Sequence, residues 1–234
     1  MEFIIVLDKP QMGENIGAAA RVMANFGIEE LRIVNPRDGW PNETASYMAT
    51  CGSYIIENAK IYTDLKEAIS DADYVIGTMG RDLSDFSKPI YTPRYLNKLL
   101  GFKKVVIIFG CERVGLNNEE LSLCSAVLTI DTKEKCKSMN LAQAVAVICY
   151  EISQINIDTY KLKHEIDGEI ATQTEVSEML QHLEDELTRK NFFQEPSKKP
   201  RMMINIRNMF NRNIFSKQEV RTLRGIIRTL SKDN

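Results

Sequence analysis

Three polar segments of this chain combine residue types that could form a binding site for a small ligand. They are residues 15–21, 109–116 and 137–144, and each either follows a short apolar run or opens a long apolar pattern. Glycines in the first two would let backbone groups approach a flat ligand closely. The side chains that could do chemistry supply carboxamide, guanidinium, carboxylate and hydroxyl groups: Asn15, Arg21, Glu112, Ser138 and Asn140.

A further loop, residues 77–81, follows the apolar run 74–76 and contains two more glycines. Turn chemistry alone explains each of these glycines equally well. Three such loops at the carboxyl ends of parallel strands, however, predict one ligand crevice at that edge of the sheet. No G-x-G-x-x-G segment follows the first strand, and the chain contains no P-loop and no nucleophile-elbow serine.

The elements that must position these loops alternate between short apolar runs and helical patterns from residue 1 to about 155. The expected strands are 2–7, 31–34, 54–56, 74–78, 104–109 and 126–130. The expected helices are 15–26, 43–50, 64–71, 93–100, 117–123 and 140–155. This alternation predicts an α/β fold, in which helices cover both faces of a mostly parallel sheet.

The last of these helices, 140–155, is apolar nearly all round. Such a helix must be covered on more than one face. We therefore expect it at a subunit interface, and a place in the centre of the core is the alternative.

The pattern changes after about residue 156. Residues 158–171 are polar and acidic, which is typical of a linker, and residues 172–175 and 216–219 fit capping boxes that each open a helix. Each helix has one apolar stripe: Val176, Leu180, Leu183 and Leu187 in the first, and Val220, Leu223, Ile227 and Leu230 in the second. Arg221, Arg224 and Arg228 fall on the opposite face of the second helix. We expect residues 172–234 to form a small helical module with a basic outer stripe.

The charge distribution agrees with an anionic partner. Residues 192–234 carry ten Lys and Arg against three Asp and Glu, whereas the rest of the chain has 20 against 29. A basic tail on an acidic body indicates nucleic-acid binding, and a solvated surface is the plain alternative. The beginning of the chain lacks the features of a signal peptide, and no apolar run approaches the length of a membrane span. Five cysteines without a C-x-x-C pair predict reduced thiols in a cytoplasmic protein, with no zinc site.

The three segments, in this order, resemble the motifs of the TrmH-like superfamily of SPOUT RNA methyltransferases. The matching patterns are N-x-G-A-A-A-R at 15–21, F-G-x-E-x-x-G-L at 109–116 and S-M-N-L-A-x-A at 138–144. The resemblance covers residues 1–155. The extension is similar to that of the TrmJ-like tRNA methyltransferases, through residues 172–173 and the L-R-G-I segment at 223–226. In that branch, the C-terminal helical extension helps to bind tRNA.

The resemblance implies methyl transfer from S-adenosylmethionine to a ribose 2′-hydroxyl of RNA by an obligate homodimer. It also implies a deep trefoil knot in the C-terminal half of the sheet, which periodicity could not reveal because knots are so rare. We expect a methyltransferase domain over 1–157, a linker over 158–171 and an RNA-binding extension over 172–234. The cofactor would lie bent in the knot loops, held mainly by backbone groups, at Thr78, Met79, Gly80, Phe109, Gly110, Ile130, Lys137, Ser138 and Met139.

The resemblance also implies roles for the polar side chains. Arg21 is the residue expected to act at the ribose. Because an arginine is a poor general base, we expect it to bind phosphate and stabilise the developing alkoxide; a surface salt bridge is the alternative. Asn15 would cap the first helix and help to position the RNA-side loop. Glu112 would organise its own loop by pairing with Arg113 or by reaching across the dimer.

Two further sets of residues receive expected roles. Ser138 and Asn140 would both contact the cofactor and hold their loop. Five arginines are the candidates for RNA contacts: Arg21, Arg81, Arg221, Arg224 and Arg228. The chain departs from the family pattern at Glu14, where glycine is common, and at Met79, Gly80, Lys137 and Met139. These departures put individual cofactor contacts in doubt, although backbone contacts would survive them.

Four functions remain to be distinguished. The leading one is methylation of a cytidine or uridine ribose on the 5′ side of the tRNA anticodon loop, at position 32 of the tRNA. The same chemistry on ribosomal RNA is the second. A knotted RNA-binding protein without turnover is the third, and the intact motif residues argue against it. A small-molecule α/β enzyme is the fourth, and the basic helical tail argues against it.

Overall fold

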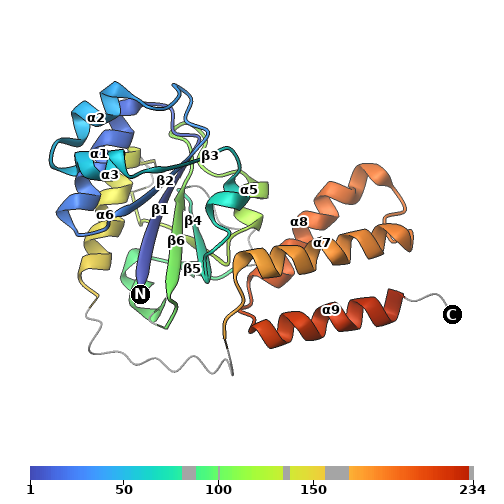
Figure 1. Ribbon diagram of the computed structural model, residues 1–234. Helices are drawn as coiled ribbons and strands as arrows, with labels where there is room; N and C mark the ends of the chain where they lie inside the picture. Colours follow the sequence, from blue (N-terminus) through green and yellow to red (C-terminus); the bar gives the residue numbers. More distant parts are fainter. Residues whose placement is uncertain (81–87, 100, 134–137, 156–168, 232–234) are drawn as a thin grey trace.

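A parallel β-sheet forms the centre of the protein (Figure 1). Within the residues that the computed structural model describes (1–80, 88–99, 101–133, 138–155 and 169–231), seven strands form one sheet in the order β3-β2-β1-β6-β4-β7-β5. Every neighbouring pair in this sheet is parallel. The strands are β1 (Glu2–Asp8), β2 (Glu30–Val34), β3 (Lys60–Tyr62), β4 (Tyr74–Thr78), β5 (Ile90–Tyr91), β6 (Lys104–Phe109) and β7 (Ala126–Leu128).

The central strands are apolar on both sides because helices cover both faces of the sheet. Along β1, Ile5 and Leu7 pack into one core, whereas Ile4 and Val6 pack into the other. The first core is shared with α1 (Gly13–Asn25), α2 (Glu43–Ala49), α3 (Ser53–Glu57), α6 (Leu141–Ser153) and the 3₁₀ helix η2 (Pro93–Leu99). The second core is shared with α4 (Leu65–Ala68) and α5 (Asn118–Ser122).

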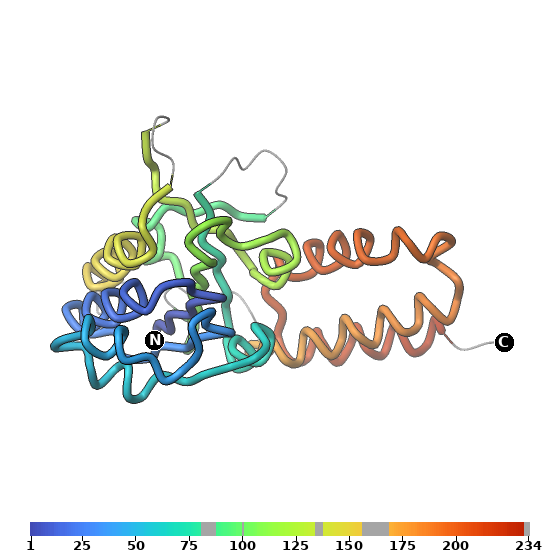
Figure 2. Tube along the Cα trace, turned by 90° about the horizontal axis from the view of Figure 1, so that it is seen from above, coloured from blue at the N-terminus to red at the C-terminus, as the bar shows by residue number. Residues whose placement is uncertain are grey.

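The C-terminal extension consists of α7 (Gln173–Arg189), α8 (Lys199–Asn211) and α9 (Lys217–Ser231), and it projects from the body on the side of α5 (Figure 2). Both expected capping boxes are confirmed. Thr172 and Glu175 form one at the start of α7, and Ser216 and Glu219 exchange the same hydrogen bonds at the start of α9. A small core joins the helices through Val176, Met179, Leu180 and Val220. No described helix has both the length and the apolar character that crossing a membrane requires.

The extension is hydrogen-bonded to the body at two places, the start of α7 and the end of α8. At the start of α7, the Gln173 backbone N–H donates to the Ala72 carbonyl (3.0 Å), and Thr174 Oγ1 donates to the Ser70 carbonyl (2.8 Å). At the end of α8, Asn211 Nδ2 donates to the Ser122 carbonyl of α5 (2.9 Å). The same carbonyl accepts a bond from the buried ammonium of Lys88 (2.9 Å). The helical module is therefore anchored to the face of the sheet that α5 covers.

Several expectations about the elements were wrong. Residues 54–56 lie in α3 and not in a strand, because Ile55 and Ile56 are buried in the core beside α1 while the edge strand follows at Lys60–Tyr62. The helix expected over 93–100 is present, as a 3₁₀ helix over Pro93–Leu99. Leu230 is 78% exposed, so the apolar stripe of α9 ends at Ile227. The strand β5 was missed because it has only two residues. Most of the expected linker, 158–168, lies outside the described residues.

Candidate functional site

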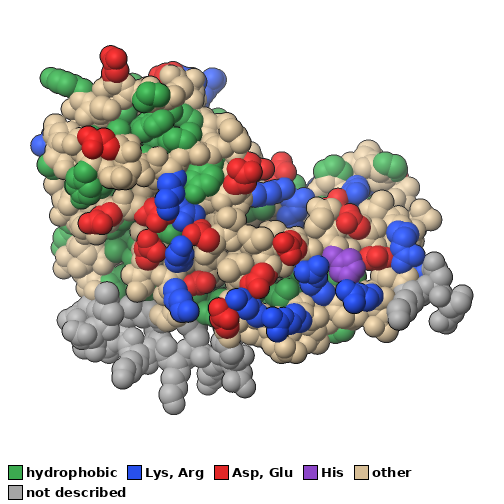
Figure 3. All heavy atoms as spheres, in the orientation of Figure 1, with side chains coloured by type: hydrophobic (Ala, Val, Ile, Leu, Met, Phe, Trp, Pro, Cys, Tyr) green, Lys and Arg blue, Asp and Glu red, His purple; other side chains and the backbone are tan. Residues whose placement is uncertain are grey.

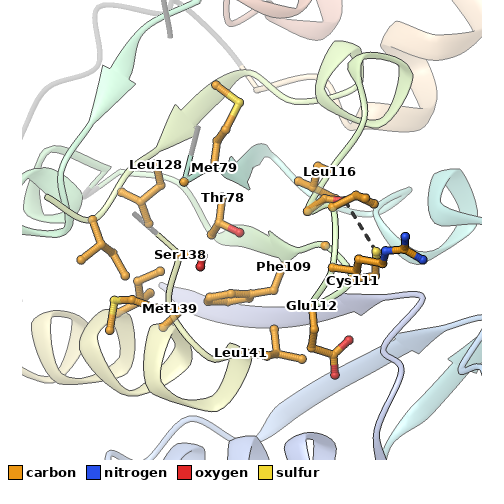
Figure 4. A pocket seen from close by; sticks show the side chains of 18 of the residues that line it. Thr78, Met79, Phe109, Cys111, Glu112, Leu116, Leu128, Ser138, Met139 and Leu141 are labelled. Carbon is orange, nitrogen blue, oxygen red and sulfur yellow. Dashed lines mark hydrogen bonds between the residues drawn. The ribbon is translucent and has the colours of Figure 1, made fainter. Parts of the chain in front are cut away.

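A cavity of about 550 Å³ lies at the carboxyl ends of β4, β6 and β7 (Figure 4). The loops after these strands and the start of α6 enclose it. It is lined by Thr78, Met79, Gly80, Phe109, Gly110, Cys111, Glu112, Arg113, Val114, Gly115, Leu116, Leu128, Ile130, Thr132, Ser138, Met139, Leu141, Ala144 and Ile148. This volume is within the range of small-molecule and cofactor sites, and the mixed apolar and polar lining is typical of them.

Short hydrogen bonds fix the loop after β4. Thr78 Oγ1 donates to the Ile108 carbonyl of β6 (2.9 Å), and the Met79 backbone N–H donates to the Leu128 carbonyl of β7 (2.9 Å). The three strands that end at the cavity are thus tied together where they meet it. Figure 4 shows Thr78 and Ser138 beside the Phe109 ring, with Met139 and Leu141 close to them.

The loop after β6 folds back on its own backbone. The Gly115 N–H donates to the Cys111 carbonyl (2.9 Å), and Gly115 has a φ of +67°, which disfavours side chains. A Cβ atom on Gly110 would lie 2.3 Å from the Gly115 carbonyl carbon and 2.4 Å from the Leu116 nitrogen. Only glycine fits at residue 110, and the resulting fold leaves the backbone of this loop against the cavity.

A chain of hydrogen bonds joins the three polar segments. Asn140 Nδ2 donates to Asn15 Oδ1 (2.9 Å), and Asn15 Nδ2 donates to Glu112 Oε1 (2.8 Å). The second oxygen of Glu112 accepts the backbone N–H of Gln11 (2.8 Å). These bonds connect the loops that follow β1 and β6 with the first turn of α6. The sequence expectation that the segments meet at one sheet edge is confirmed.

The contacts of these side chains differ from two expectations. Glu112 pairs with Asn15 and Gln11 and not with Arg113, and its carboxylate points away from the middle of the cavity (Figure 4). Asn15 does not cap the first helix, because α1 begins at Gly13. Asn140 is the cap of α6, where its Oδ1 accepts the N–H of Ala142 (2.9 Å). All three side chains therefore hold loops in place.

The expected cofactor residues come together in the structure. Thr78, Met79, Gly80, Phe109, Gly110, Ile130, Ser138 and Met139 all line the cavity. Lys137 and Arg81 lie outside the described residues. Arg21 is not among the lining residues: it is exposed on α1, almost two turns beyond Asn15. The body therefore places every described cofactor candidate at the cavity but leaves Arg21 apart from it.

The expected basic stripe lies on α9. Arg221 and Arg228 are exposed, whereas Arg224 is half-buried and forms an ion pair with Glu178 of α7 (3.4 Å). In Figure 3, Lys and Arg side chains gather over α9 and the neighbouring edge of the body, with acidic side chains between them. The stripe is thus less continuous than expected, because α7 supplies a carboxylate to one of its members.

Sequence reasoning missed part of the cavity wall. Leu128 lines it from the end of β7, Thr132 from the loop that follows, and Ala144 and Ile148 from α6. The signal for the last two was present, since they share one helical stripe with Leu141. No comparable signal marks Leu128 or Thr132, because their positions depend on where β7 stops.

A buried acid lies at the same edge of the sheet. Asp8 ends β1 and is 2% exposed; Lys9 Nζ lies 3.4 Å from its Oδ2 and also pairs with Glu120 of α5. Burial, aided by the negative charge of Glu120, raises the pKa of Asp8 to about 7, although Lys9 opposes this effect. Among the described residues, Asp8 Oδ1 has no hydrogen-bond partner. Ionisation of Asp8 therefore lowers the stability of the folded state.

We expect Asp8→Asn to raise thermal stability relative to the unchanged protein at pH 8 more than at pH 5. In the folded protein Asp8 keeps its proton up to about pH 7, whereas its ordinary pKa is 3.8. The folded state binds more protons between these values, so this group makes the protein less stable as the pH rises from about 4 to about 7. Melting temperatures across this range test the prediction, and a difference between the two proteins that does not change with pH would contradict it.

Family models match both parts of the chain. The SpoU rRNA Methylase family matches residues 2–150, and the domain described as tRNA methyltransferase TrmJ, C-terminal domain, matches residues 174–234. The first match corresponds to the body of the structure, and the second corresponds to the C-terminal extension.

Known relatives match either nearly the whole chain or about two thirds of it. The tRNA (cytidine/uridine/adenosine-2′-O-)-methyltransferase TrmJ of Pseudomonas aeruginosa is 31% identical over 242 residues, which cover 97% of this chain and 93% of that protein. The tRNA (cytidine-2′-O-)-methyltransferase TrmJ of Methanocaldococcus jannaschii is 45% identical over 152 residues, which cover 63% of this chain and 66% of that protein. The crystal structure of TrmJ from Z. mobilis ZM4 matches with a TM-score of 0.90 and 34% identity, covering 99% of this chain and 100% of the other.

Proposed function

This chain belongs to the SpoU rRNA methylase family, and from that membership we propose that it transfers a methyl group from S-adenosylmethionine to a ribose 2′-hydroxyl of tRNA. One observation carries the choice of tRNA. Both parts of the chain, body and extension, match a tRNA 2′-O-methyltransferase along nearly its whole length. A likeness confined to the body would leave the RNA class open.

The cavity suits this cofactor. Its apolar wall, which includes Ile130, Leu141 and Ile148, can hold a flat adenine, and the glycine backbone at residues 80 and 110 can approach it closely. S-adenosylmethionine supplies a methyl group that its own sulfonium charge has already activated. The protein therefore has to position a hydroxyl and assist the loss of its proton. Positioning alone can contribute on the order of 7 kcal/mol or more.

The polar residues divide this work between holding and reacting. Asn15, Glu112 and Asn140 keep the three loops in register through their hydrogen bonds, and Ser138 reaches the cavity from the third loop. Arg21 stabilises the developing alkoxide of the ribose or binds its neighbouring phosphate. Its guanidinium does not release a proton at neutral pH, so the proton of the hydroxyl passes to phosphate or water.

The position of Arg21 supports a homodimer. Arg21 is exposed and lies outside the cavity of its own chain. It can act at a cavity only if another molecule brings Arg21 and that cavity together. We propose that a second copy of the chain does so, by packing on α1 and α6. Val147 of α6 is only half-buried, and Tyr150, which touches Phe26 edge-on, is 50% exposed, so apolar surface remains on this side. Burying that surface between two copies would be favourable.

The finer parts of the proposal concern the fold, the target and the place of action. We propose a methyltransferase domain over 1–157, joined by a linker over 158–171 to an RNA-binding extension over 172–234. The loops around the cavity would form the trefoil knot of the SPOUT class. Arg221, Arg224 and Arg228 would contact tRNA phosphates. The target would be a cytidine or uridine on the 5′ side of the anticodon loop, and the enzyme would work in the cytoplasm, where tRNA is used.

Methyl transfer tests the function directly. The chain is incubated with labelled S-adenosylmethionine and, separately, with unmodified tRNA and unmodified ribosomal RNA. We expect label in tRNA. Label in ribosomal RNA alone would show that the substrate is ribosomal RNA and not tRNA. Cofactor binding without label in either RNA would indicate a knotted RNA-binding protein.

A further inference from the structure

The loop that joins β2 to α2 reaches the same edge of the sheet as the cavity. It is held at three points. The Asn35 N–H donates to the Tyr62 carbonyl (3.0 Å), and the Arg37 N–H donates to the Pro10 carbonyl (3.0 Å). At its far end, Asn42 caps α2 and packs against Gly13, where an added Cβ would lie 2.3 Å from Asn42 Oδ1. The loop therefore presents its side chains from a fixed backbone.

Arg37 lies beside the Glu112 side of the cavity. Its partner Pro10 precedes Gln11, and the N–H of Gln11 donates to Glu112 Oε2 (2.8 Å). The Arg37 and Glu112 side chains interact electrostatically. The hydrogen bond and charge of Asp38 are the main cause of the raised pKa of the Arg37 guanidinium, and the charge of Glu112 adds to it. A permanent positive charge thus lies within electrostatic reach of a carboxylate that lines the cavity, while Arg37 itself is not one of the lining residues.

This charge is available to a ligand. The Arg37 side chain is 58% exposed, and its ion pair is with the adjacent Asp38, which is 47% exposed (Nε to Oδ1, 2.9 Å; Nη2 to Oδ2, 3.4 Å). Exposed ion pairs contribute little because water screens them. A phosphate can accept two parallel N–H bonds from a guanidinium, as the Asp38 carboxylate does, and can therefore take its place.

The substrate creates a need for such a group. RNA whose ribose enters the cavity brings phosphates to the wall that Glu112 helps to form, and like charges repel. Glu112 is already hydrogen-bonded by two donors, so it cannot turn away from the RNA without breaking the link to Asn15. A cation near Glu112 offsets the repulsion without disturbing the hydrogen-bonded chain.

We propose that Arg37 binds a phosphodiester of the RNA strand next to the target ribose. Asp38 holds the guanidinium in place until the RNA phosphate replaces the Asp38 carboxylate. This inference rests on the proposed function. Arg37 is a substrate-binding residue in this account, so its loss affects the binding of RNA and not the chemical step or the binding of the cofactor.

The test compares Arg37→Ala with the unchanged full-length chain, using unmodified tRNA. We expect about a tenfold weaker tRNA affinity and a similarly raised KM, with kcat and cofactor affinity unchanged. The slope of log affinity against log salt concentration should become shallower by about one unit, because one phosphate contact is lost. Lys60→Ala, which removes an exposed charge at the opposite edge of the sheet, should leave KM near its original value.

A second pair of variants isolates the role of Asp38. Asp38→Asn frees the guanidinium and should strengthen tRNA binding, whereas in an Arg37→Ala background the same change should have a smaller effect. Unchanged tRNA affinity in Arg37→Ala would overturn the inference, and so would a fall in kcat alone. Direct binding keeps this test independent of the proposed function: an unchanged chain that binds tRNA but transfers no methyl group would refute the activity and not the contact.

Discussion

Replacing Arg21 by alanine should lower the turnover of methyl transfer by about 100- to 1,000-fold, while the affinity for S-adenosylmethionine stays almost the same. The size of the effect is that of removing one group that stabilises a developing oxyanion. The affinity is preserved because Arg21 is exposed on α1 and does not line the cavity. Single-turnover rates and cofactor titrations measure the two quantities separately. Equal losses in both would refute the assignment.

The same variant tests whether the site is shared between two copies of the chain. Arg21→Ala and Asn140→Ala are each expected to be inactive alone. If Arg21 acts in the cavity of its partner, mixed dimers regain one complete site, and up to roughly a quarter of full activity returns on mixing. If Arg21 acts within its own chain, no activity returns. The dimer itself is measured by light scattering.

Replacing Gly110 by alanine should weaken S-adenosylmethionine binding by about 10- to 100-fold. The added Cβ would meet backbone atoms of residues 115 and 116 at 2.3 and 2.4 Å, and backbone cannot move aside as a flexible side chain can. Forcing an extra carbon into such a space typically costs about 1–3 kcal/mol, and about 1.4 kcal/mol corresponds to a tenfold change in affinity. Isothermal titration calorimetry gives the affinity directly.

Gly225→Ala is the matched control for this variant. Gly225 lies in α9, where an added Cβ meets nothing within 4 Å. Alanine there should leave cofactor affinity unchanged and stabilise the helix by about 0.5–1 kcal/mol. Gly110→Ala binding the cofactor as tightly as Gly225→Ala would show that the loop after β6 tolerates a side chain, which would contradict its described geometry.

The sheet and its edge could be predicted because their signals are local. Apolar runs such as 104–109 have the length of buried strands, and glycines mark the loops that follow them. The strand expected at 54–56 was wrong because a three-residue apolar run fits a strand and a short helix equally well. Only the packing of Ile55 and Ile56 under α1 decides between them, and that packing depends on residues far away in the chain.

The cofactor cavity could be predicted more completely than the reacting groups. Loops at strand ends must converge, which predicted the crevice, and the family resemblance assigned residues such as Thr78 and Phe109 to it. The hydrogen-bond partner of Glu112 could not be predicted, because Asn15 lies 97 residues away in the sequence and many donors compete. Arg37 gave no signal in the sequence, since its importance comes from the bond between its backbone and Pro10.

The position of the transferred methyl group tests the account most directly. Unmodified tRNA is treated with the chain and S-adenosylmethionine, digested to nucleosides and analysed by mass spectrometry. We expect one 2′-O-methylated pyrimidine nucleoside, located on the 5′ side of the anticodon loop and absent when Arg21→Ala is used. A methyl group on a base, or none on tRNA under conditions in which the cofactor binds, would contradict it.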